Sequence, residues 1–193
     1  MDYRNLLVNS TAYGKIGKAK ELLGKRLGAP QSVSDLVMET IGRNIDLLDI
    51  DSALRAYIKA FAGTLGKNAH VLGVLLYGSV AKGIYTACSD IDLLIIVDDS
   101  QDKFKMLDAI SNITDRLDGS AMSLFHRQLP SSISPLVMRA GELGRFEPIH
   151  FDFLDYGVVL YDYADTLANF LMDVHKMKHK REFTQYGEVL TWQ

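Results

Sequence analysis

The chain has 193 residues, a size that suits one compact domain or a catalytic core with a small helical appendage. Apolar residues make up 48% of it, which is ample for a buried core and excludes a disordered chain. The net charge of -3 does not indicate a protein that wraps nucleic acid, although a local basic patch is compatible with it. The one cysteine, Cys88, excludes an intrachain disulfide framework and a Cys-rich zinc site. Without a secretory signal or a run long enough to span a membrane, we expect a cytoplasmic protein with no membrane partner.

The first third of the chain has the apolar spacing of helices, so we expect a helical N-terminal region over residues 1–68. Its first two helices are separated by a break at Gly28-Ala-Pro30, and either Asp51 or Ser52 can cap a third helix. The apolar stripe of this third helix consists of Leu54, Tyr57, Ile58, Phe61 and Leu65. We interpret the N-terminal stripes as core or as a face through which two copies could form a homodimer.

The character of the sequence changes near His70, and residues 69–193 predict a domain that mixes strands and helices. The runs VLGVLLY (71–77) and DIDLLIIV (90–97) are typical of covered central strands. Further along we expect a helix over 101–117, a strand over 120–128, a short helix near 136–143, a strand within 150–162 with a turn at Gly157, and a last helix over about 163–180. The expected fold class is α/β (α+β): a mixed sheet flanked by helices, with a helical N-terminal region and a C-terminal helix.

A glycine and a serine follow the first apolar strand. Gly78 permits a tight turn and a close approach of the backbone by a ligand. Ser79 would begin a short helix, whose free N–H groups and positive dipole end suit a phosphate. Lys82, within the first turn, could add a full positive charge.

Two carboxylates open the next strand. Because side chains alternate along a strand, Asp90 and Asp92 should point to one side while Ile91 points into the core. Two carboxylates at such a short separation repel each other unless a cation lies between them. Magnesium binds one or two protein carboxylates together with waters and substrate phosphates. A phosphate cradle beside such a platform is suited to in-line attack on a nucleotide phosphorus.

The pattern of Gly78-Ser79, a loop over residues 80–89 and then Ser89-Asp90-Ile91-Asp92-Leu93 resembles the DNA polymerase beta-like nucleotidyltransferase superfamily. That superfamily includes antibiotic nucleotidyltransferases, CCA-adding enzymes and small stand-alone nucleotidyltransferases. The resemblance covers about residues 72–162, roughly half of the chain. It implies a nucleotidyltransferase fold with a third carboxylate between hydrophobic residues on a later strand, and Phe151-Asp152-Phe153 matches that position.

The resemblance also implies roles for individual residues. Gly78 and Ser79 would hold the β- and γ-phosphates of a nucleoside triphosphate, and Asp90 and Asp92 would bind two magnesium ions. Asp152 would help to hold one metal and would deprotonate the acceptor hydroxyl. The set expected to act in catalysis and metal binding is therefore Asp90, Asp92 and Asp152, with Gly78, Ser79 and Lys82 binding the nucleotide.

Some of these assignments have alternatives. Asp155 is the rival to Asp152, although it lies nearer the turn and lacks a hydrophobic neighbour on its C-terminal side. Lys82 stands where the superfamily commonly has arginine, so it can neutralise phosphate but cannot make a planar bidentate contact. His175 and His179 would be one turn apart on the last helix, where a solvated basic face is the favoured interpretation over a shared metal.

The sequence therefore predicts a magnesium-dependent nucleotidyltransferase that moves a nucleoside monophosphate, AMP from ATP being favoured, to a hydroxyl and releases pyrophosphate. The acceptor could be a small molecule, an RNA end or a protein side chain, because the motif does not determine specificity. Two other classes stay open: a nucleotide-binding regulator without turnover, and an antitoxin-like interaction module that acts through the N-terminal helices.

Overall fold

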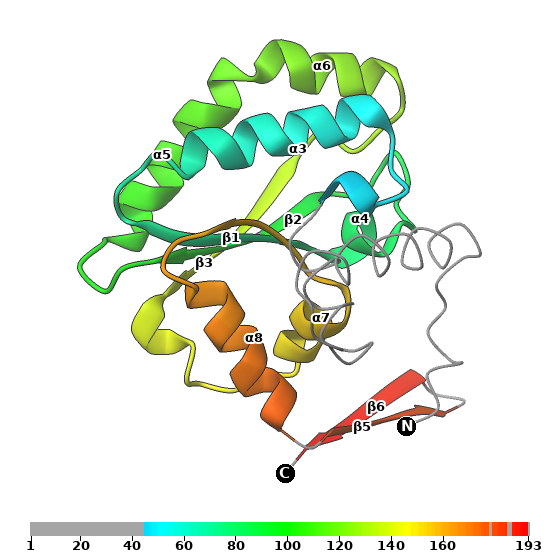
Figure 1. Cartoon of the computed structure of the whole chain (residues 1–193). Helices are drawn as coiled ribbons and strands as arrows, with labels where there is room; N and C mark the ends of the chain where they lie inside the picture. Colours follow the sequence, from blue (N-terminus) through cyan, green and yellow to red (C-terminus); the bar gives the residue numbers. More distant parts are fainter. Residues whose placement is uncertain (1–44, 178, 185–186, 193) are drawn as a thin grey trace, which may run out of the picture.

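The computed structural model describes residues 45–177, 179–184 and 187–192 (Figure 1). The helices expected before residue 45, and the homodimer face assigned to them, lie outside the described residues. Residues Ile45–Leu47 form a short 3-10 helix (η2), within the region that the sequence predicted to be helical.

A four-stranded mixed sheet forms the centre of the molecule, with the order β3-β2-β1-β4. Strand β1 pairs antiparallel with both β2 and β4, whereas β2 and β3 run parallel. The strands are β1 (Val71–Tyr77), β2 (Ile91–Val97), β3 (Ile133–Arg139) and β4 (Val158–Asp162). The mixed sheet and the two central strands expected from the sequence are confirmed.

Helices cover both faces of this sheet (Figure 1). On one face lie α3 (Ser52–Leu65), α5 (Lys103–Arg116) and α6 (Asp118–His126), and on the other lie α7 (Ile149–Tyr156) and α8 (Thr166–Lys176). Strand β2 contributes to both cores because its side chains alternate: Leu93 and Ile95 pack with α3 and α5, and Leu94 and Ile96 with α7 and α8. The same alternation determines which helices lie on the side of the sheet toward which Asp92, at the N-terminal end of β2, points.

Helix α3 forms where the sequence predicted it. The side chain of Asp51 accepts a hydrogen bond from the N–H of Ala53 at 2.8 Å, so Asp51 is the cap. The predicted stripe from Leu54 to Leu65 is buried against the sheet. Helix α3 thus shares a core with the strands, and the division of the chain at residues 68 and 69 stays a prediction.

Two elements in the middle of the chain differ from the expectation. The segment predicted as a strand over 120–128 is helix α6, since its SAMSLFHRQ sequence has no β-branched residue and favours a helix. The short helix predicted near 136–143 is instead strand β3 followed by the 3-10 helix η3 (Ala140–Glu142). Pro135 is tolerated within β3 because this strand is at the edge of the sheet.

The segment that carries Asp152 is also different from the prediction. The sequence predicted a strand within 150–162, but residues 149–156 form helix α7. The buried residues His150, Phe151, Phe153 and Leu154 have helical spacing, and they fill the core under α8. Only β4, after Gly157, is the strand that the sequence predicted for 150–162.

The C-terminal helix is confirmed but shorter than expected. Both carboxylate oxygens of Asp162 accept backbone hydrogen bonds at the start of α8, from Leu167 at 2.8 Å and Ala168 at 3.1 Å. A hairpin of β5 (His179–Thr184) and β6 (Gly187–Trp192), which the sequence did not predict, follows α8. His175 and His179 therefore do not share a helix.

Candidate functional site

Strand β1 ends at a tight turn, where the five-residue helix α4 (Gly78–Lys82) begins. Gly78 has a φ of +70°, a conformation that glycine adopts without steric cost. A Cβ atom at Gly78 would collide with the carboxylate of Asp92. The turn and the second strand are thus in direct contact, and only glycine leaves room for the carboxylate between them.

Asp92 is the second residue of β2, as predicted, whereas Asp90 lies just before this strand, which the sequence predicted to begin at residue 90. Asp92 has the same orientation along the strand as Leu94 and Ile96, so it points toward the face covered by α7 and α8. Asp90 is exposed just before the strand, and Asp92 is half-buried opposite Tyr77 of β1. The backbone therefore brings the Asp92 carboxylate to the turn at Gly78, and Asp90 is close enough to influence the charge of Asp92.

The charge of Asp92 is poorly compensated. Burial raises the pKa of its carboxyl, and the negative charge of Asp90 raises it further, whereas a hydrogen bond from Ser134 acts in the opposite direction. The pKa of Tyr77 is raised too, first by burial and then by the charge of Asp92. The N-terminal end of β2 thus holds negative charge that the described side chains do not neutralise, which is the condition under which a bound cation is favourable.

Lys82 and Asp152 meet across the gap between α4 and α7. The Nζ atom of Lys82 is 2.9 Å from Oδ2 of Asp152, and both side chains are half-buried. The same Nζ atom lies 4.8 Å from the centre of the Tyr156 ring, one turn further along α7. In this structure the charge of Lys82 is therefore paired with that of Asp152.

The third carboxylate is arranged differently from the prediction. Asp152 lies on a helix, not on a strand, although that helix covers the face toward which Asp92 points. Within residues 45–177 and the described hairpin, no group of three or more His, Cys, Asp and Glu side chains could hold a metal ion. Asp90, Asp92 and Asp152 thus do not form a three-carboxylate cluster among the described residues. The rival, Asp155, is exposed on the same helix.

Ser134 is a site residue that the sequence did not indicate. In the parallel pairing of β2 and β3 it is the partner of Asp92, and its hydroxyl hydrogen-bonds with that carboxylate. The surrounding segment was expected to be a loop and a short helix, so its register beside β2 could not be anticipated. The apolar run of Leu136, Val137 and Met138, read as a strand and aligned with β2, is the signal that would have revealed it.

These residues are compatible with a divalent cation, but with two protein carboxylates and not three. Asp90 and Asp92 are oxygen ligands of the type that magnesium prefers, and their mutual repulsion would be relieved by a cation. Asp92 is close to the Gly78 turn, so a phosphate at the turn and a cation at the carboxylates could share oxygen atoms.

Comparison with known proteins relates part of the chain to one family. A model of the family "Polymerase beta, Nucleotidyltransferase" matches residues 59–142, somewhat less than half of the chain. Over this part of the chain, the match confirms the resemblance to the DNA polymerase beta-like nucleotidyltransferase superfamily. The match includes the Gly78 turn, both carboxylates of β2 and Ser134, and it ends before Asp152. No curated protein matches the chain significantly.

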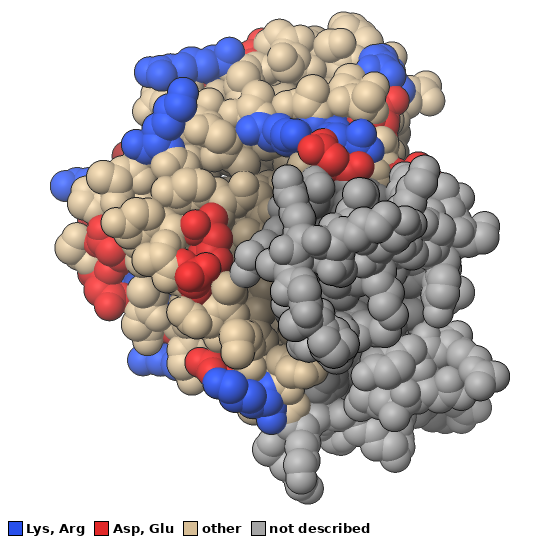
Figure 2. All heavy atoms as spheres, in the orientation of Figure 1, with Lys and Arg blue, Asp and Glu red and all other residues tan. Residues whose placement is uncertain are grey.

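The surface around this domain carries both signs of charge. In the view of Figure 2, basic side chains lie mainly over the layer of α3, α5 and α6, and acidic side chains lie lower on the same face. A hollow of about 250 Å³ beside α3 and β4 is lined by Lys59, Gly63 and Val159 among others, and contains none of the candidate residues. None of the described helices has the length and apolar character needed to cross a membrane.

Proposed function

We propose that the protein is a magnesium-dependent nucleotidyltransferase that moves a nucleoside monophosphate, AMP from ATP being favoured, to an acceptor hydroxyl and releases pyrophosphate. The observation that carries the proposal is the contact between the Gly78 turn and the Asp92 carboxylate. The turn that would bind phosphate and the carboxylate that would bind the cation are adjacent there, and the family match includes both residues.

Each residue would have a separate task. The backbone N–H groups of Gly78 and Ser79, in the first turn of α4, have no carbonyl partner within the helix and would hold the β- and γ-phosphates. Asp90 and Asp92 would hold magnesium, which supplies charge neutralisation at the phosphates when bound. Lys82 would turn from Asp152 to a phosphate oxygen, because an anionic triphosphate competes with one carboxylate for its charge.

Asp152 would then be available to the acceptor. Freed from Lys82, its carboxylate could take the proton of a hydroxyl, and it could add an oxygen ligand to the cation, as the superfamily resemblance implies. The acceptor remains open among a small molecule, an RNA end and a protein side chain. A cytoplasmic location is part of the proposal and follows only from the sequence.

A second candidate function is favoured by one observation. The strand beside Asp92 contributes Ser134, so Asp90 and Asp92 have no third carboxylate beside them on the adjacent strand β3. A protein that binds the nucleotide and magnesium without turning them over would need no more than this. The regulator and the enzyme differ in one respect, which is whether AMP leaves the triphosphate.

The test is incubation of the protein with labelled ATP, magnesium and pools of small molecules, RNA ends and proteins. The expected result is a product heavier by the mass of AMP, with an equal amount of pyrophosphate. The matched control is Asp92→Asn, which keeps the shape of the side chain and removes its charge. Nucleotide binding with no AMP transfer to any pool would favour the regulator, and the absence of both would exclude the two functions together.

A further inference from the structure

Strands β2 and β3 form a parallel pair whose polar ends coincide. Ile91 pairs with Ile133, Asp92 with Ser134 and Leu94 with Leu136. Paired residues on neighbouring strands point to the same face of a sheet, about 4.8 Å apart. The position nearest to Asp92 on the adjacent strand therefore carries a hydroxyl group, and β3 has no Asp or Glu from Ile133 to Arg139.

The chemical difference between a serine and a carboxylate at this position is large. A serine hydroxyl can rotate and donate a hydrogen bond to Asp92, which orients the carboxylate without adding charge. An aspartate there would be a third anionic oxygen ligand beside Asp90 and Asp92. Cation affinity rises with the number of charged ligands in a site, so the serine keeps the affinity of the protein alone low.

Asp152 does not change this in the nucleotide-free structure. Its carboxylate forms an ion pair with Lys82, and it does not join the other two carboxylates in a metal-binding cluster among the described residues. The missing cation ligands would have to come from elsewhere. Triphosphate oxygens held at the Gly78 turn are the nearest source, because that turn is in contact with Asp92.

We propose that Ser134 makes magnesium binding at this site depend on the nucleotide, an inference that rests on the proposed function. Ser134 is a positioning residue that orients the Asp92 carboxylate. A carboxylate at position 134 would supply a third protein ligand, and magnesium could then bind without the nucleotide. The cation and the triphosphate consequently enter together, and the free protein does not retain magnesium.

The experiment is a calorimetric titration of Mg²⁺ into the full chain, without ATP and with ATP at fixed concentration, and the heat of Mg²⁺ binding to ATP alone is subtracted. The variant Ser134→Asp adds the carboxylate, and Ser134→Thr keeps the hydroxyl. Ser120→Asp makes the same change of charge at an exposed position of α6 and is the matched control. Circular dichroism establishes that each variant is folded.

Wild type and Ser134→Thr are expected to bind Mg²⁺ only with ATP. Ser134→Asp should bind Mg²⁺ without ATP, at least about tenfold more tightly than wild type, whereas Ser120→Asp should behave as wild type does. Folded Ser134→Asp with no gain over wild type would overturn the inference. If Ser134→Asp does not fold, Ser134→Asn, which adds an uncharged oxygen ligand, decides it: a smaller gain supports the inference, and no gain overturns it.

The failure of this inference is distinguishable from that of the proposed function. Wild type that binds no Mg²⁺ even with ATP would contradict the proposed function, while the titration of Ser134→Asp with Mg²⁺ alone would still decide the role of Ser134. Wild type that binds Mg²⁺ equally well with and without ATP would refute the dependence on nucleotide and leave the metal site intact.

Discussion

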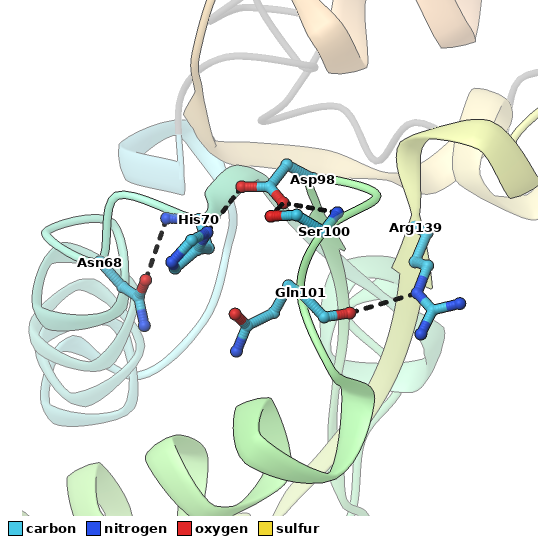
Figure 3. A network of polar contacts seen from close by, with 6 residues as sticks. All are labelled: Asn68, His70, Asp98, Ser100, Gln101 and Arg139. Carbon is cyan, nitrogen blue, oxygen red and sulfur yellow. Dashed lines mark hydrogen bonds and ion pairs between the residues drawn. The ribbon is translucent and has the colours of Figure 1, made fainter.

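The carboxylates at the two ends of strand β2 have pKa values shifted in opposite directions. At the C-terminal end, Asp98 accepts hydrogen bonds from the N–H and the hydroxyl of Ser100 and lies 2.7 Å from Nδ1 of His70 (Figure 3). Those contacts lower the pKa of Asp98, the hydroxyl of Ser100 most of all and the His70 ring next. Nearby, the ion pair with Lys103 and the backbone N–H of Arg139 lower the pKa of Glu142. At the N-terminal end, the pKa of Asp92 is raised.

The difference distinguishes a structural end of the strand from a functional one. Carboxylates with lowered pKa values stabilise the fold when they are ionised, because the native state holds their charge better than the unfolded chain does. A carboxylate with a raised pKa destabilises the fold when it is ionised. Charge that makes the fold less stable is typical of binding and catalytic sites, where a ligand compensates it.

The largest effect is expected when the functional end loses its charge. Asp92→Asn should weaken magnesium-dependent ATP binding by more than about 100-fold, since even residues that only support a metal ligand contribute about 10–100-fold. AMP transfer should be lost with it. Asp98→Asn, at the other end of the same strand, is the control and should bind ATP as wild type does in calorimetry.

The same pair of variants should change stability in opposite directions. Asp92→Asn should raise the melting temperature of the nucleotide-free protein at pH 7, and Asp98→Asn should lower it. Because the pKa of Asp92 is raised, the gain from Asp92→Asn should disappear in acid, where the carboxyl is protonated in both the folded and the unfolded states. Melting curves of equal sign for the two variants would remove the distinction between the two ends.

The next effect is on the rate of transfer alone. Asp152→Asn should keep magnesium–ATP binding largely intact and slow AMP transfer by about 10²–10⁴-fold, which is the contribution of a general base. Asp155→Asn, three residues along the same helix and exposed, is the control and should transfer normally. Normal transfer by Asp152→Asn with loss in Asp155→Asn would move the third catalytic position to Asp155.

Alanine substitutions at two glycines with the same backbone conformation distinguish the effect of backbone strain from that of the contact with Asp92. Gly78 and Gly83 both have a φ of +70°, but nothing lies within 4 Å of a Cβ atom built on Gly83. Gly83→Ala should therefore cost only about 1–2 kcal/mol of backbone strain in urea unfolding and should bind ATP. Gly78→Ala should cost more and lose ATP binding, because its methyl group displaces the Asp92 carboxylate. Equal losses in the two variants would mean that the contact with Asp92 is unimportant.

The smallest effect concerns the helix that carries Asp152. His150 is fully buried among Phe146, Phe153 and Phe170, and its Nε2 atom has no hydrogen-bond partner. Burial lowers its pKa, while the charge of Glu147 acts in the opposite direction. As the pH falls below about 6.5, His150 becomes protonated in the unfolded chain but stays neutral in the folded protein. The free energy of unfolding therefore decreases from that pH down to the pKa of His150 in the folded protein.

Replacement of this histidine should reduce that loss. The free energy of unfolding of His150→Leu should fall less steeply than that of wild type between about pH 6.5 and pH 5. His126→Leu, which removes an exposed histidine on α6, is the matched control for the loss of an imidazole. An identical slope for His150→Leu and wild type would mean that His150 takes up its proton equally in the folded and unfolded states.

The sequence predicted the parts of the site that are encoded locally. Gly78 could be placed because it directly follows a short apolar strand, and Asp92 because it directly precedes the apolar residues of the next strand. A turn residue and the start of a strand are both recognisable from a few neighbouring residues. The contact between them follows from the pairing of two consecutive strands, which the sequence makes probable but does not specify.

The remaining differences have a common physical cause. Phe151-Asp152-Phe153 alternates as a strand does, yet the two rings are buried on a helix, and a segment of eight residues is too short for periodicity alone to decide. Ser134 depends on a parallel pairing across more than thirty intervening residues and on an edge strand that contains a proline. Tertiary packing determines both positions, and no local pattern carries that information.

The central claim is that the N-terminal end of β2 and the Gly78 turn bind magnesium and a nucleoside triphosphate as one unit. It is tested most directly by melting curves of wild-type protein with Mg²⁺, with ATP and with both. The account predicts that both together raise the melting temperature by more than the sum of the separate shifts, and that Asp92→Asn abolishes this excess. Separate shifts that simply add, or no shift with both ligands present, would contradict it.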